Sequence, residues 1–424
     1  MSRILLLATT TGYQTRAFGD AANRLGVELV FATDRCNMLE DPWWDGAIPI
    51  RFYDEQASVD AILEATRSRP IDGVLVVGDR PTVIAARVSE ALGLPGHPPD
   101  AAAIARNKRL FRERLRDSGL PAPSFVVASL DADPRALVRS VSFPAVIKPV
   151  ALSGSRGVMR VDDPAGLRDA FERLRAMLRS AEILAERDPA HQVVLVEDFI
   201  RGRELALEGI LHEGRLHLLT LFDKPDRLDG PFFEETIYIT PSSEPTGVQD
   251  AVADAVRQAA STIGLRHGPI HAECRVTGSG VFVLEVAARP IGGLCARALR
   301  FGAHQSAISL EELLLRHALG ESPDGWRRES DASGVMMIPI PRRGVFRGVS
   351  GTDAASNVDG VESVEITAKI DQRLVPLPEG ASYFGFIFAR GSTPASVERA
   401  LREAHACLEF TVDPLWQVVQ SRHG

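Results

Sequence analysis

Over the first hundred residues, short apolar runs alternate with amphipathic stretches. The apolar runs at 4–8, 28–32 and 73–77 predict strands, and the stretches at 15–25 and 57–67 have helical spacing. Strand–helix–strand alternation predicts a parallel sheet covered by helices. We therefore expect a Rossmann-like α/β domain over residues 1–98, ending in the Gly- and Pro-rich segment 93–99. The loop after the first strand lacks Gly-x-Gly-x-x-Gly, so no dinucleotide site is expected.

The remainder of the chain has a mixed α+β pattern. Strands are predicted at 144–148, 158–161, 193–198 and 204–211, and helices at 167–178 and 250–263. A polar segment, 321–333, separates residues 99–325 from a small α+β domain at 326–424. In that last region we expect strands at 335–340, 361–366 and 384–389 and a helix at 396–406.

Composition narrows the class of protein. A chain of 424 residues predicts two to four domains, and a net charge of −8 argues against nucleic acid as a partner. No apolar run is long enough to span a membrane. Cys36, Cys274, Cys295 and Cys407 are scattered, which indicates neither a disulfide framework nor a cysteine zinc site. A cytoplasmic protein with reduced thiols is the expectation.

The most informative feature is a predicted hairpin with two glutamates. Alternating runs at 270–276 and 281–286 flank a loop at 278–280, which would set Thr277 opposite Val281. Glu273 and Glu285 then face each other on one side of the sheet, where like charges destabilise. A Mg²⁺ ion held against nucleotide phosphates would resolve this repulsion. The alternatives are another register, or neutralisation of one glutamate by Arg275 or Arg289.

Two further segments are consistent with nucleotide binding. Lys148 ends an apolar strand and precedes the loop 153–157, Ser-Gly-Ser-Arg-Gly, so an ammonium and several N–H groups could surround phosphate oxygens. No Gly-Lys dipeptide occurs, which excludes a Walker loop. The strand 193–198 leads into an acidic turn that suits an adenine wedge, and Glu204 follows at a spacing that suits ribose hydroxyls. Alone, each segment is equally an ordinary turn.

Taken in order, these segments resemble the ATP-grasp superfamily, in which two α+β lobes close on ATP. The resemblance extends from the first strand to about residue 320, and Asn107-Lys108 matches the position of the family's first ATP-contacting lysine. It implies ATP-grasp central and lid domains within 99–325, with the lid at about 123–203. ATP with Mg²⁺, for which Mn²⁺ is a substitute, is the expected cofactor set.

The resemblance also implies roles for individual residues. The residues implied to contact ATP are Lys108, Lys148, Ser153, Gly154, Ser155, Gly157, Glu197, Phe199, Ile200 and Glu204. Glu273 and Glu285 would bind the metal. Lys224 is a further candidate phosphate contact, and its alternative is an ordinary loop lysine.

One departure from the usual family pattern indicates which branch of the ATP-grasp superfamily the chain resembles. Where many members read Glu-x-Asn-x-Arg, this chain has Ala287 between Glu285 and Arg289, and alanine cannot ligate a metal. Arg289 has a planar fork that suits a substrate carboxylate. The Glu-x-Ala-x-Arg pattern with Gly292-Gly293 is similar to the L-amino-acid ligase branch, whose members couple amino acids into dipeptides or similar amides.

The predicted activity is therefore that of an ATP-dependent carboxylate–amine ligase that works through an acyl phosphate, with Arg289, Lys148 and Lys224 as its catalytic residues. His271, Arg289, Gly292 and Gly293 are the candidate substrate residues, although His271 is equally a structural imidazole. The partners would be a small carboxylate and a small amine. An ATP-grasp carboxylase or formate-activating ligase and a non-catalytic nucleotide-binding protein are the alternatives. The C-terminal region would cap the acyl site or form a homodimer interface.

Overall fold

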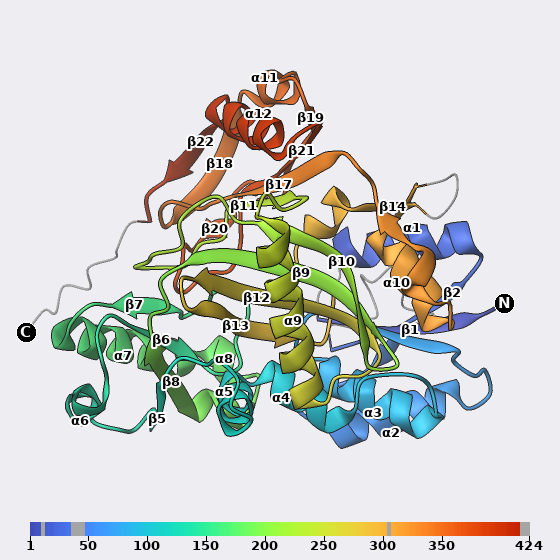
Figure 1. Cartoon of the computed structure of the whole chain (residues 1–424), viewed down its shortest axis with the longest axis horizontal. Coiled ribbons are helices and arrows are strands. Elements are labelled where there is room, and N and C mark those ends of the chain that lie inside the picture. Colours follow the sequence, from blue (N-terminus) through green and yellow to red (C-terminus); the bar gives the residue numbers. More distant parts are fainter. Residues whose placement is uncertain (10–12, 35–46, 303–306, 416–424) are drawn as a thin grey trace, which may run out of the picture.

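The structure, a computed structural model, describes residues 1–9, 13–34, 47–302 and 307–415. Within these residues the strands form five sheets, one of eight strands, two of four and two of three. The eight-stranded sheet lies at the centre, with a smaller α/β unit at each end of its lower edge (Figure 1). No helix in the described ranges is long and apolar enough to cross a membrane.

The N-terminal unit is the predicted Rossmann-like fold. Its sheet has the order β3-β2-β1-β4, and all three pairings are parallel. Its strands are β1 Arg3–Ala8, β2 Glu28–Thr33, β3 Ala47–Pro49 and β4 Gly73–Val77, and its helices are α1 Tyr13–Leu25, α2 Glu55–Thr66 and α3 Thr82–Leu92. The predicted strands and helices agree with these bounds within about two residues, but the short β3 was not predicted. Cys36 lies outside the described residues.

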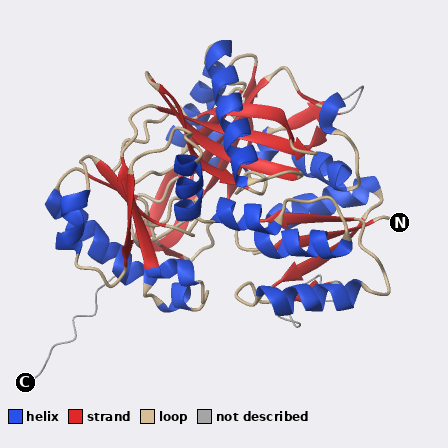
Figure 2. Cartoon of the chain, turned by 60° about the horizontal axis from the view of Figure 1, so that its bottom comes forward, coloured by secondary structure: helices blue, strands red, loops and turns tan. Residues whose placement is uncertain are grey.

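A second unit contains a four-stranded antiparallel sheet with the order β5-β8-β6-β7. Two helices, α4 Pro99–Arg106 and α5 Lys108–Asp117, connect it to the N-terminal unit. Its elements are β5 Phe125–Ser129, α6 Pro134–Leu137, β6 Ala145–Pro149, β7 Met159–Val161, α7 Pro164–Leu178, α8 Ala181–Leu184 and β8 Val193–Asp198. This sheet and its helices stand apart as a separate lobe (Figure 2). It falls within the segment predicted to be the lid.

The central sheet has the order β13-β12-β9-β10-β11-β17-β21-β19. Its strands are β9 Arg203–His212, β10 Arg215–Asp223, β11 Ile237–Thr240, β12 Gly268–Thr277, β13 Gly280–Ala287, β17 Ala332–Ile338, β19 Val361–Ile366 and β21 Gly385–Gly391. Alternate side chains of β9 enter two different cores, as the two-residue period of a strand requires. Leu207 and Leu211 pack with α9 Thr246–Ile263, whereas Ala206 and Ile210 pack with α10 Leu310–Ala318. The sheet is therefore buried on both faces.

The C-terminal region extends this central sheet. Its strands β17, β21 and β19 continue from β11, and α12 Pro394–Ala406 packs over β17 and β21. The domain predicted for 326–424 thus has its own helices but shares a sheet with the preceding region, and the polar segment 321–333 does not mark a sheet boundary. Smaller elements complete the region: β14 Arg300–Gly302, β15 Ala307–Ser309, β16 Arg327–Arg328, β18 Gly344–Ser350, α11 Thr352–Ser356, β20 Arg373–Leu374 and β22 Glu409–Asp413.

Candidate active site

A cavity of about 730 Å³ lies where three parts of the molecule meet. These are the central sheet, the N-terminal unit and the lobe built on the β5-β8-β6-β7 sheet, which we call the lid lobe. All of the predicted site residues except Gly157 and Lys224 line the cavity. Those that line it are Lys108, Lys148, Ser153, Gly154, Ser155, Glu197, Phe199, Ile200, Glu204, His271, Glu273, Glu285, Arg289, Gly292 and Gly293. The order of motifs along the chain therefore predicted which residues meet in space.

The strand β8 places Glu197 in a buried cluster of charges. Arg112 of α5 donates from Nε and Nη2 to the two Glu197 oxygens at 2.8 and 3.2 Å, and Lys148 of β6 donates to one of them. Burial favours the neutral acid, but the two cations outweigh it and lower the pKa of Glu197 to about 2. Burial lowers the pKa of Lys148 to about 8, against the pull of Glu197. Arg112, which is completely buried, was not predicted as a site residue.

The Gly/Ser loop after β6 adopts a backbone that requires its glycines. Gly154 and Gly157 have φ values of 64° and 72°, and Ser155 has 55°, in the left-handed region that glycine tolerates best. Lys108 Nζ donates to the Leu152 carbonyl at 2.9 Å, just before the loop, and lies 2.9 Å from Glu285 Oε2. The loop is thus held beside the first predicted ATP-contacting lysine.

The predicted pairing of Glu273 with Glu285 is confirmed, although the predicted turn is wrong. Thr277 pairs with Gly280 rather than with Val281, and a register shift next to Glu273 then skips one residue of β13. The shorter turn and the β-bulge offset each other. The two glutamates therefore face each other as expected.

The cations near the glutamates are arranged differently from the alternative in which Arg275 or Arg289 neutralises one of the pair. Lys224 Nζ lies 2.8 Å from Glu204 and 3.3 Å from Glu273, and it also contacts Glu235. Arg275 pairs with Glu204 at 3.0 Å. Glu204, predicted to hold ribose, therefore has both carboxylate oxygens in ion pairs with protein cations.

Glu235 is a third carboxylate in this cluster and was missed by the sequence reasoning. Burial and the neighbouring Glu235 raise the pKa of Glu273. Burial also opposes ionisation of Glu235, but Lys224 and the hydrogen bond with Glu273 together lower its pKa. The Glu204, Glu235 and Glu273 oxygens lie within 4.8 Å of one another. Such a set of carboxylate oxygens fits a hard divalent cation.

The substrate residues lie at the other side of the cavity. Arg289 donates from Nε and Nη2 to the two oxygens of Asp79 at 2.8 and 3.1 Å. The fork predicted to bind a substrate carboxylate is therefore paired with a protein carboxylate. Asp79 follows the carboxyl end of β4, the edge at which open parallel sheets commonly bind ligands.

Glu208 of β9 organises the segment around Gly292 and Gly293. One of its oxygens lies 3.0 Å from Nδ1 of His271, and the other accepts the N–H of Ile291 at 3.1 Å. Glu208 is fully buried, and burial raises its pKa despite the nearby imidazole. His271 is thus held by a structural partner while its ring lines the cavity.

An apolar wall completes the cavity beside the acidic turn. Phe199 and Phe233 pack with Val146 and Leu228, and the two ring centroids are 6.2 Å apart. The Ile200 carbonyl accepts a hydrogen bond from Arg275 at 2.9 Å, which fixes the turn after β8. These residues could hold a flat heteroaromatic ring.

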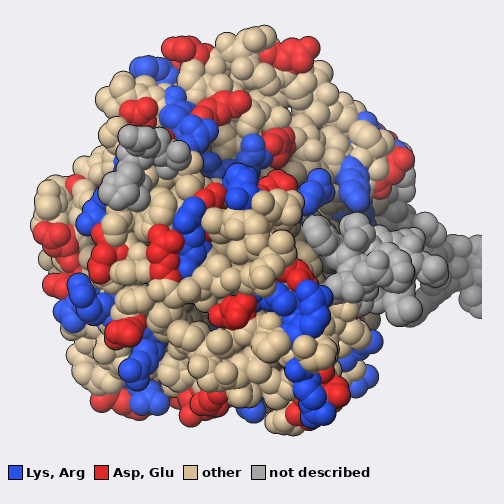
Figure 3. All heavy atoms as spheres, turned by 90° about the vertical axis from the view of Figure 1, so that its right-hand side faces the viewer, with Lys and Arg blue, Asp and Glu red and all other residues tan. Residues whose placement is uncertain are grey.

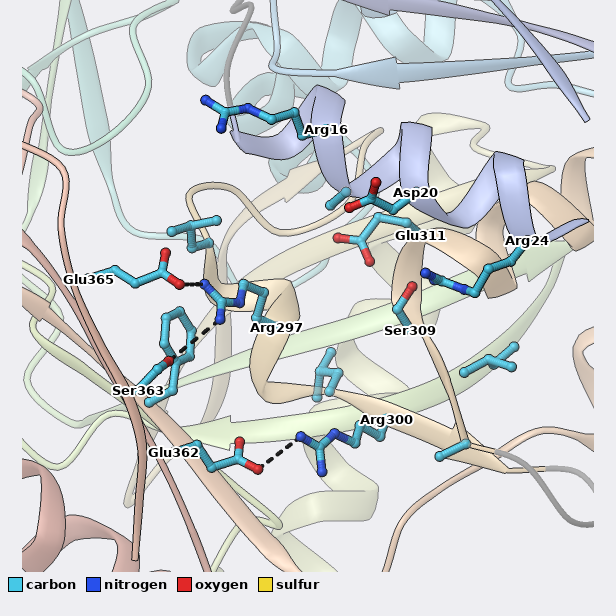
Figure 4. Close-up of a pocket in the computed structure, with 16 residues that line it drawn as sticks. Arg16, Asp20, Arg24, Arg297, Arg300, Ser309, Glu311, Glu362, Ser363 and Glu365 are labelled. Carbon is cyan, nitrogen blue, oxygen red and sulfur yellow. Dashed lines mark hydrogen bonds and ion pairs between the residues drawn. The ribbon is translucent and has the colours of Figure 1, made fainter. Parts of the chain in front are cut away.

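A second cavity, of about 650 Å³, lies between α1, the segment around Arg297 and β19 (Figure 4). Its charges pair largely within the wall: Arg297 contacts Glu365, and Arg300 lies 2.8 Å from Glu362. On the molecular face in Figure 3, basic and acidic side chains are likewise interspersed. This cavity carries none of the predicted site residues.

Comparison with known proteins places this geometry in a family. An ATP-grasp domain model matches residues 141–298, an ATP-grasp N-terminal domain model matches 19–96, and an L-amino acid ligase C-terminal domain 2 model matches 336–413. The chain belongs to the ATP-grasp superfamily and is an ATP-grasp ligase. Within that superfamily its C-terminal domain is of the L-amino acid ligase type, and the chain is most similar to the L-amino acid ligases and related peptide-forming synthases.

Individual relatives agree with this assignment. The crystal structure of an L-amino acid ligase from Bacillus licheniformis matches with a TM-score of 0.81 and 27% identity, over 97% of this chain and 99% of that one. Dapdiamide A synthase from Enterobacter agglomerans is 26% identical over 83% of each chain. The N5-carboxyaminoimidazole ribonucleotide synthetase of Thermotoga maritima, 16% identical with a TM-score of 0.68, shares the fold alone.

Proposed function

We propose that this protein joins a carboxylate to an amine at the expense of ATP, with an amino acid as at least one substrate. The observation that carries the proposal is the single cavity in which Lys108, Lys148 and the Gly/Ser loop face the paired glutamates. The L-amino acid ligase type of the C-terminal domain supports an amino acid substrate. The similarity to dapdiamide A synthase supports amide formation.

ATP would lie between the lid lobe and the central sheet. Lys108, Lys148 and the N–H groups of 153–155 would bind its phosphates, and the apolar wall around Phe199 would hold adenine against the backbone of 197–200. Because the Glu197 carboxylate is paired with Arg112 and Lys148, its contribution to adenine binding would come from the backbone. Glu204 would have to release one of its ion pairs to accept ribose hydroxyls.

The carboxylates fit a divalent cation, for which we propose Mg²⁺, with Mn²⁺ as a substitute. Glu273 and Glu285 would hold it, and Ala287 contributes no ligand. Three observations support the fit: the two glutamates face each other, Glu235 lies beside Glu273, and the pKa of Glu273 is raised. When bound, such an ion offsets the negative charge of the phosphates. Lys224 would then share its charge between the carboxylates and the phosphate.

The proposed reaction has two steps. A carboxylate oxygen of the first substrate attacks the γ-phosphorus of ATP, the bond to the β-phosphate oxygen breaks, and ADP leaves. The amine nitrogen then attacks the carbonyl carbon of the acyl phosphate, phosphate leaves with the former carboxylate oxygen, and the nitrogen loses a proton. No protein nucleophile is needed, so the cavity acts by positioning and by electrostatic stabilisation.

Arg289 would position the carboxylate-bearing substrate. Its Nε and Nη2 are paired with Asp79 and its Nη1 donates to the Pro290 carbonyl at 2.9 Å. A substrate carboxylate would therefore bind to the remaining N–H groups of the two Nη atoms. His271 and Gly292-Gly293 would line the same pocket, held in place by Glu208. The identity of both substrates depends on this pocket.

The lid lobe and the C-terminal region would exclude water together, because an acyl phosphate hydrolyses readily. The Gly157 N–H donates to the Pro378 carbonyl at 2.8 Å, and Arg173 lies 3.0 Å from Glu379. These contacts support a capping role for the C-terminal region over the loop at 153–157. The predicted homodimer remains a prediction.

Two alternatives remain open to test. A carboxylase or formate-activating ligase shares the fold, as the ribonucleotide synthetase likeness illustrates, but the C-terminal domain favours the amide-forming branch. The presence of both lysines and both glutamates together counts against a non-catalytic nucleotide-binding protein. Ala287 is the residue that favours it.

The test is release of phosphate from MgATP, screened across amino acids and other carboxylates and amines, singly and in pairs, with mass spectrometry of the products. Phosphate release that requires one particular pair, with a product lighter than the two substrates by one water, is the expected result. Stimulation by bicarbonate or formate would instead support the first alternative. ATP binding without stimulation by any pair would contradict the ligase proposal.

A further inference from the structure

Three histidines from separate elements meet at the end of the central sheet farthest from the carboxylates. His212 ends β9, His267 directly precedes β12, and His317 lies in the last turn of α10. The register of β9 with β12 runs without a shift from Arg203 opposite Val276 to Leu211 opposite Gly268. His212 and His267 are therefore neighbours one step beyond the last paired residues.

The three imidazoles are in direct contact. His212 Nδ1 lies 3.1 Å from His317 Nε2, and the rings of His267 and His317 are stacked with centroids 4.4 Å apart. The His212 and His267 centroids are 5.2 Å apart. One ring nitrogen from each histidine lies within 4.8 Å of the other two, a separation that small side-chain rotations can close onto one ion.

A fourth histidine adjoins this group. The His217 ring on β10 has its centroid 6.2 Å from that of His212, and its Nδ1 lies 3.3 Å from Asp324. Its Nε2 is buried without a hydrogen-bond partner in the structure. A carboxylate on one ring nitrogen orients the other for metal binding, so His217 is placed to contribute or to support a ligand.

The imidazole nitrogens of this group are suited to binding a transition metal. Burial and the neighbouring imidazoles lower the pKa of His317 to about 3, and burial also lowers the pKa of His267. Both rings are therefore neutral at physiological pH, which is the form in which imidazole binds a metal. Imidazole nitrogens bind zinc, copper, nickel and cobalt, whereas magnesium and calcium prefer oxygen.

We propose that His212, His267 and His317 form a binding site for a divalent transition metal of the zinc class, with His217 or water completing the coordination. This site is distinct from the nucleotide cavity. Glu204 and His212 are separated by eight residues along one strand, which corresponds to roughly 26 Å at 3.3 Å per residue. None of the four histidines lines that cavity.

The metal would fix α10 to the sheet. The end of this helix also packs against the N-terminal unit, where a methyl group on Gly73 would meet the Ala318 carbonyl at 2.6 Å. A ligand on α10 and two ligands on the sheet would therefore join the N-terminal unit to the central sheet. The proposed role is structural, because none of the three histidines lines either of the two cavities described above.

Metal binding requires a small rearrangement. A metal lies in the plane of each imidazole that binds it, so the stacked rings of His267 and His317 must tilt apart. The hydrogen bond between His212 and His317 must also be exchanged for coordination, and the ring that donates it must carry its proton on its other nitrogen instead.

The experiment uses the full chain after dialysis against a chelator, with Zn²⁺ titrated calorimetrically and Co²⁺ used as a coloured probe of nitrogen ligation. The variants are His212→Gln and His267→Gln, which lie at partly exposed positions. His405→Gln, a half-buried histidine on α12, is the matched control. A Glu273→Gln, Glu285→Gln background removes the carboxylate ligands, so that binding there cannot be mistaken for binding to the histidines.

We expect one Zn²⁺ per chain in the unchanged protein, in the control and in the carboxylate background, with a rise in Tm on metal addition. Each histidine variant should lose more than about 100-fold in zinc affinity while keeping the metal-free Tm close to that of the unchanged chain. No zinc uptake by the unchanged protein, or zinc uptake by the histidine variants equal to that of the unchanged chain, would overturn the proposal and leave a hydrogen-bonded imidazole cluster.

Discussion

Two ends of the same strand pair carry two kinds of polar cluster. On one face of β9 and β12, Glu204 pairs with Arg275 at the end inside the nucleotide cavity. At the other end His212 adjoins His267. Both clusters are built by strand alternation, which places residues 204, 208 and 212 on one side of β9.

The two ends differ in whether their polar side chains are charged or neutral. At the cavity end, carboxylates remain near cations, and the pKa of Lys224 is raised well above its ordinary value because the surrounding glutamates outweigh burial. At the histidine end, burial and the neighbouring imidazoles lower the pKa of His317 and keep its ring neutral. The first environment suits a hard cation and phosphates, and the second suits a softer metal. One sheet thus provides two separate ligand chemistries.

The largest expected effect comes from removing a carboxylate at the cavity end of the strand pair while the histidine end stays intact. Glu285→Gln should lower ligase turnover roughly 10³-fold, because a metal contributes several kcal/mol of charge stabilisation to phosphoryl transfer. Turnover is measured as ADP release with the identified substrate pair. The same variant should bind zinc at the histidine end as the unchanged chain does. Loss of zinc binding together with turnover would show that the two ends are not independent.

The free energy of unfolding tests the buried charge cluster of Arg112, Lys148 and Glu197, which adjoins the cavity. Arg112→Met should lower the free energy of unfolding by about 3–5 kcal/mol, because it removes one partner of a buried ion pair and leaves Glu197 with Lys148 alone. Urea unfolding provides the measurement. Arg114→Met, an exposed position on the same helix, should change stability by less than about 0.5 kcal/mol. Equal effects of the two variants would contradict the buried role of Arg112.

The Asp79–Arg289 pair tests how the substrate side is positioned. Asp79→Asn should raise the KM for the carboxylate substrate about 10-fold, since a hydrogen bond to a charged group contributes about 1.5–3 kcal/mol. The fold should be retained, and kcat should change less than KM. Asp20→Asn, in the second cavity, is the control and should leave KM unchanged. An unchanged KM in Asp79→Asn would contradict a role for the Asp79–Arg289 pair in binding the carboxylate substrate.

The smallest effect concerns pH. The pKa of Glu197 is about 2 in the folded chain against its ordinary 4.5, so its ion pairs stabilise the fold above pH 4.5 and are lost as the pH falls toward 2. The stability difference between the unchanged chain and Glu197→Gln should therefore shrink over this interval. Chemical denaturation at a series of pH values measures it. A difference that stays constant would contradict the lowered pKa.

The sequence predicted the site well where local patterns determine it. The pairing of Glu273 with Glu285 was predicted through an incorrect turn, because the β-bulge restored the register that the shorter loop had shifted. The glycine loop and Lys148 follow from a strand–loop pattern. The N-terminal parallel sheet also follows from apolar periodicity alone.

The missed residues contact partners far along the chain. Arg112 lies 85 positions from Glu197 and Asp79 lies 210 positions from Arg289, so neither pair leaves a local pattern. Two signals were nonetheless present. Arg112 is a charged residue on the face of α5 that carries Phe111 and Leu115, and Asp79 follows the carboxyl end of a parallel strand. The histidine cluster leaves no local pattern either, because His212, His267 and His317 come from three separate elements.

The most direct test of the proposed reaction follows the carboxylate oxygen of the acid identified by the substrate screen. The acid is labelled with ¹⁸O in its carboxylate and incubated with ATP and the amine, and the released phosphate is analysed by mass spectrometry. The acyl-phosphate mechanism predicts one ¹⁸O atom transferred to phosphate for each amide formed, with ADP unlabelled. Amide formation with unlabelled phosphate would contradict it.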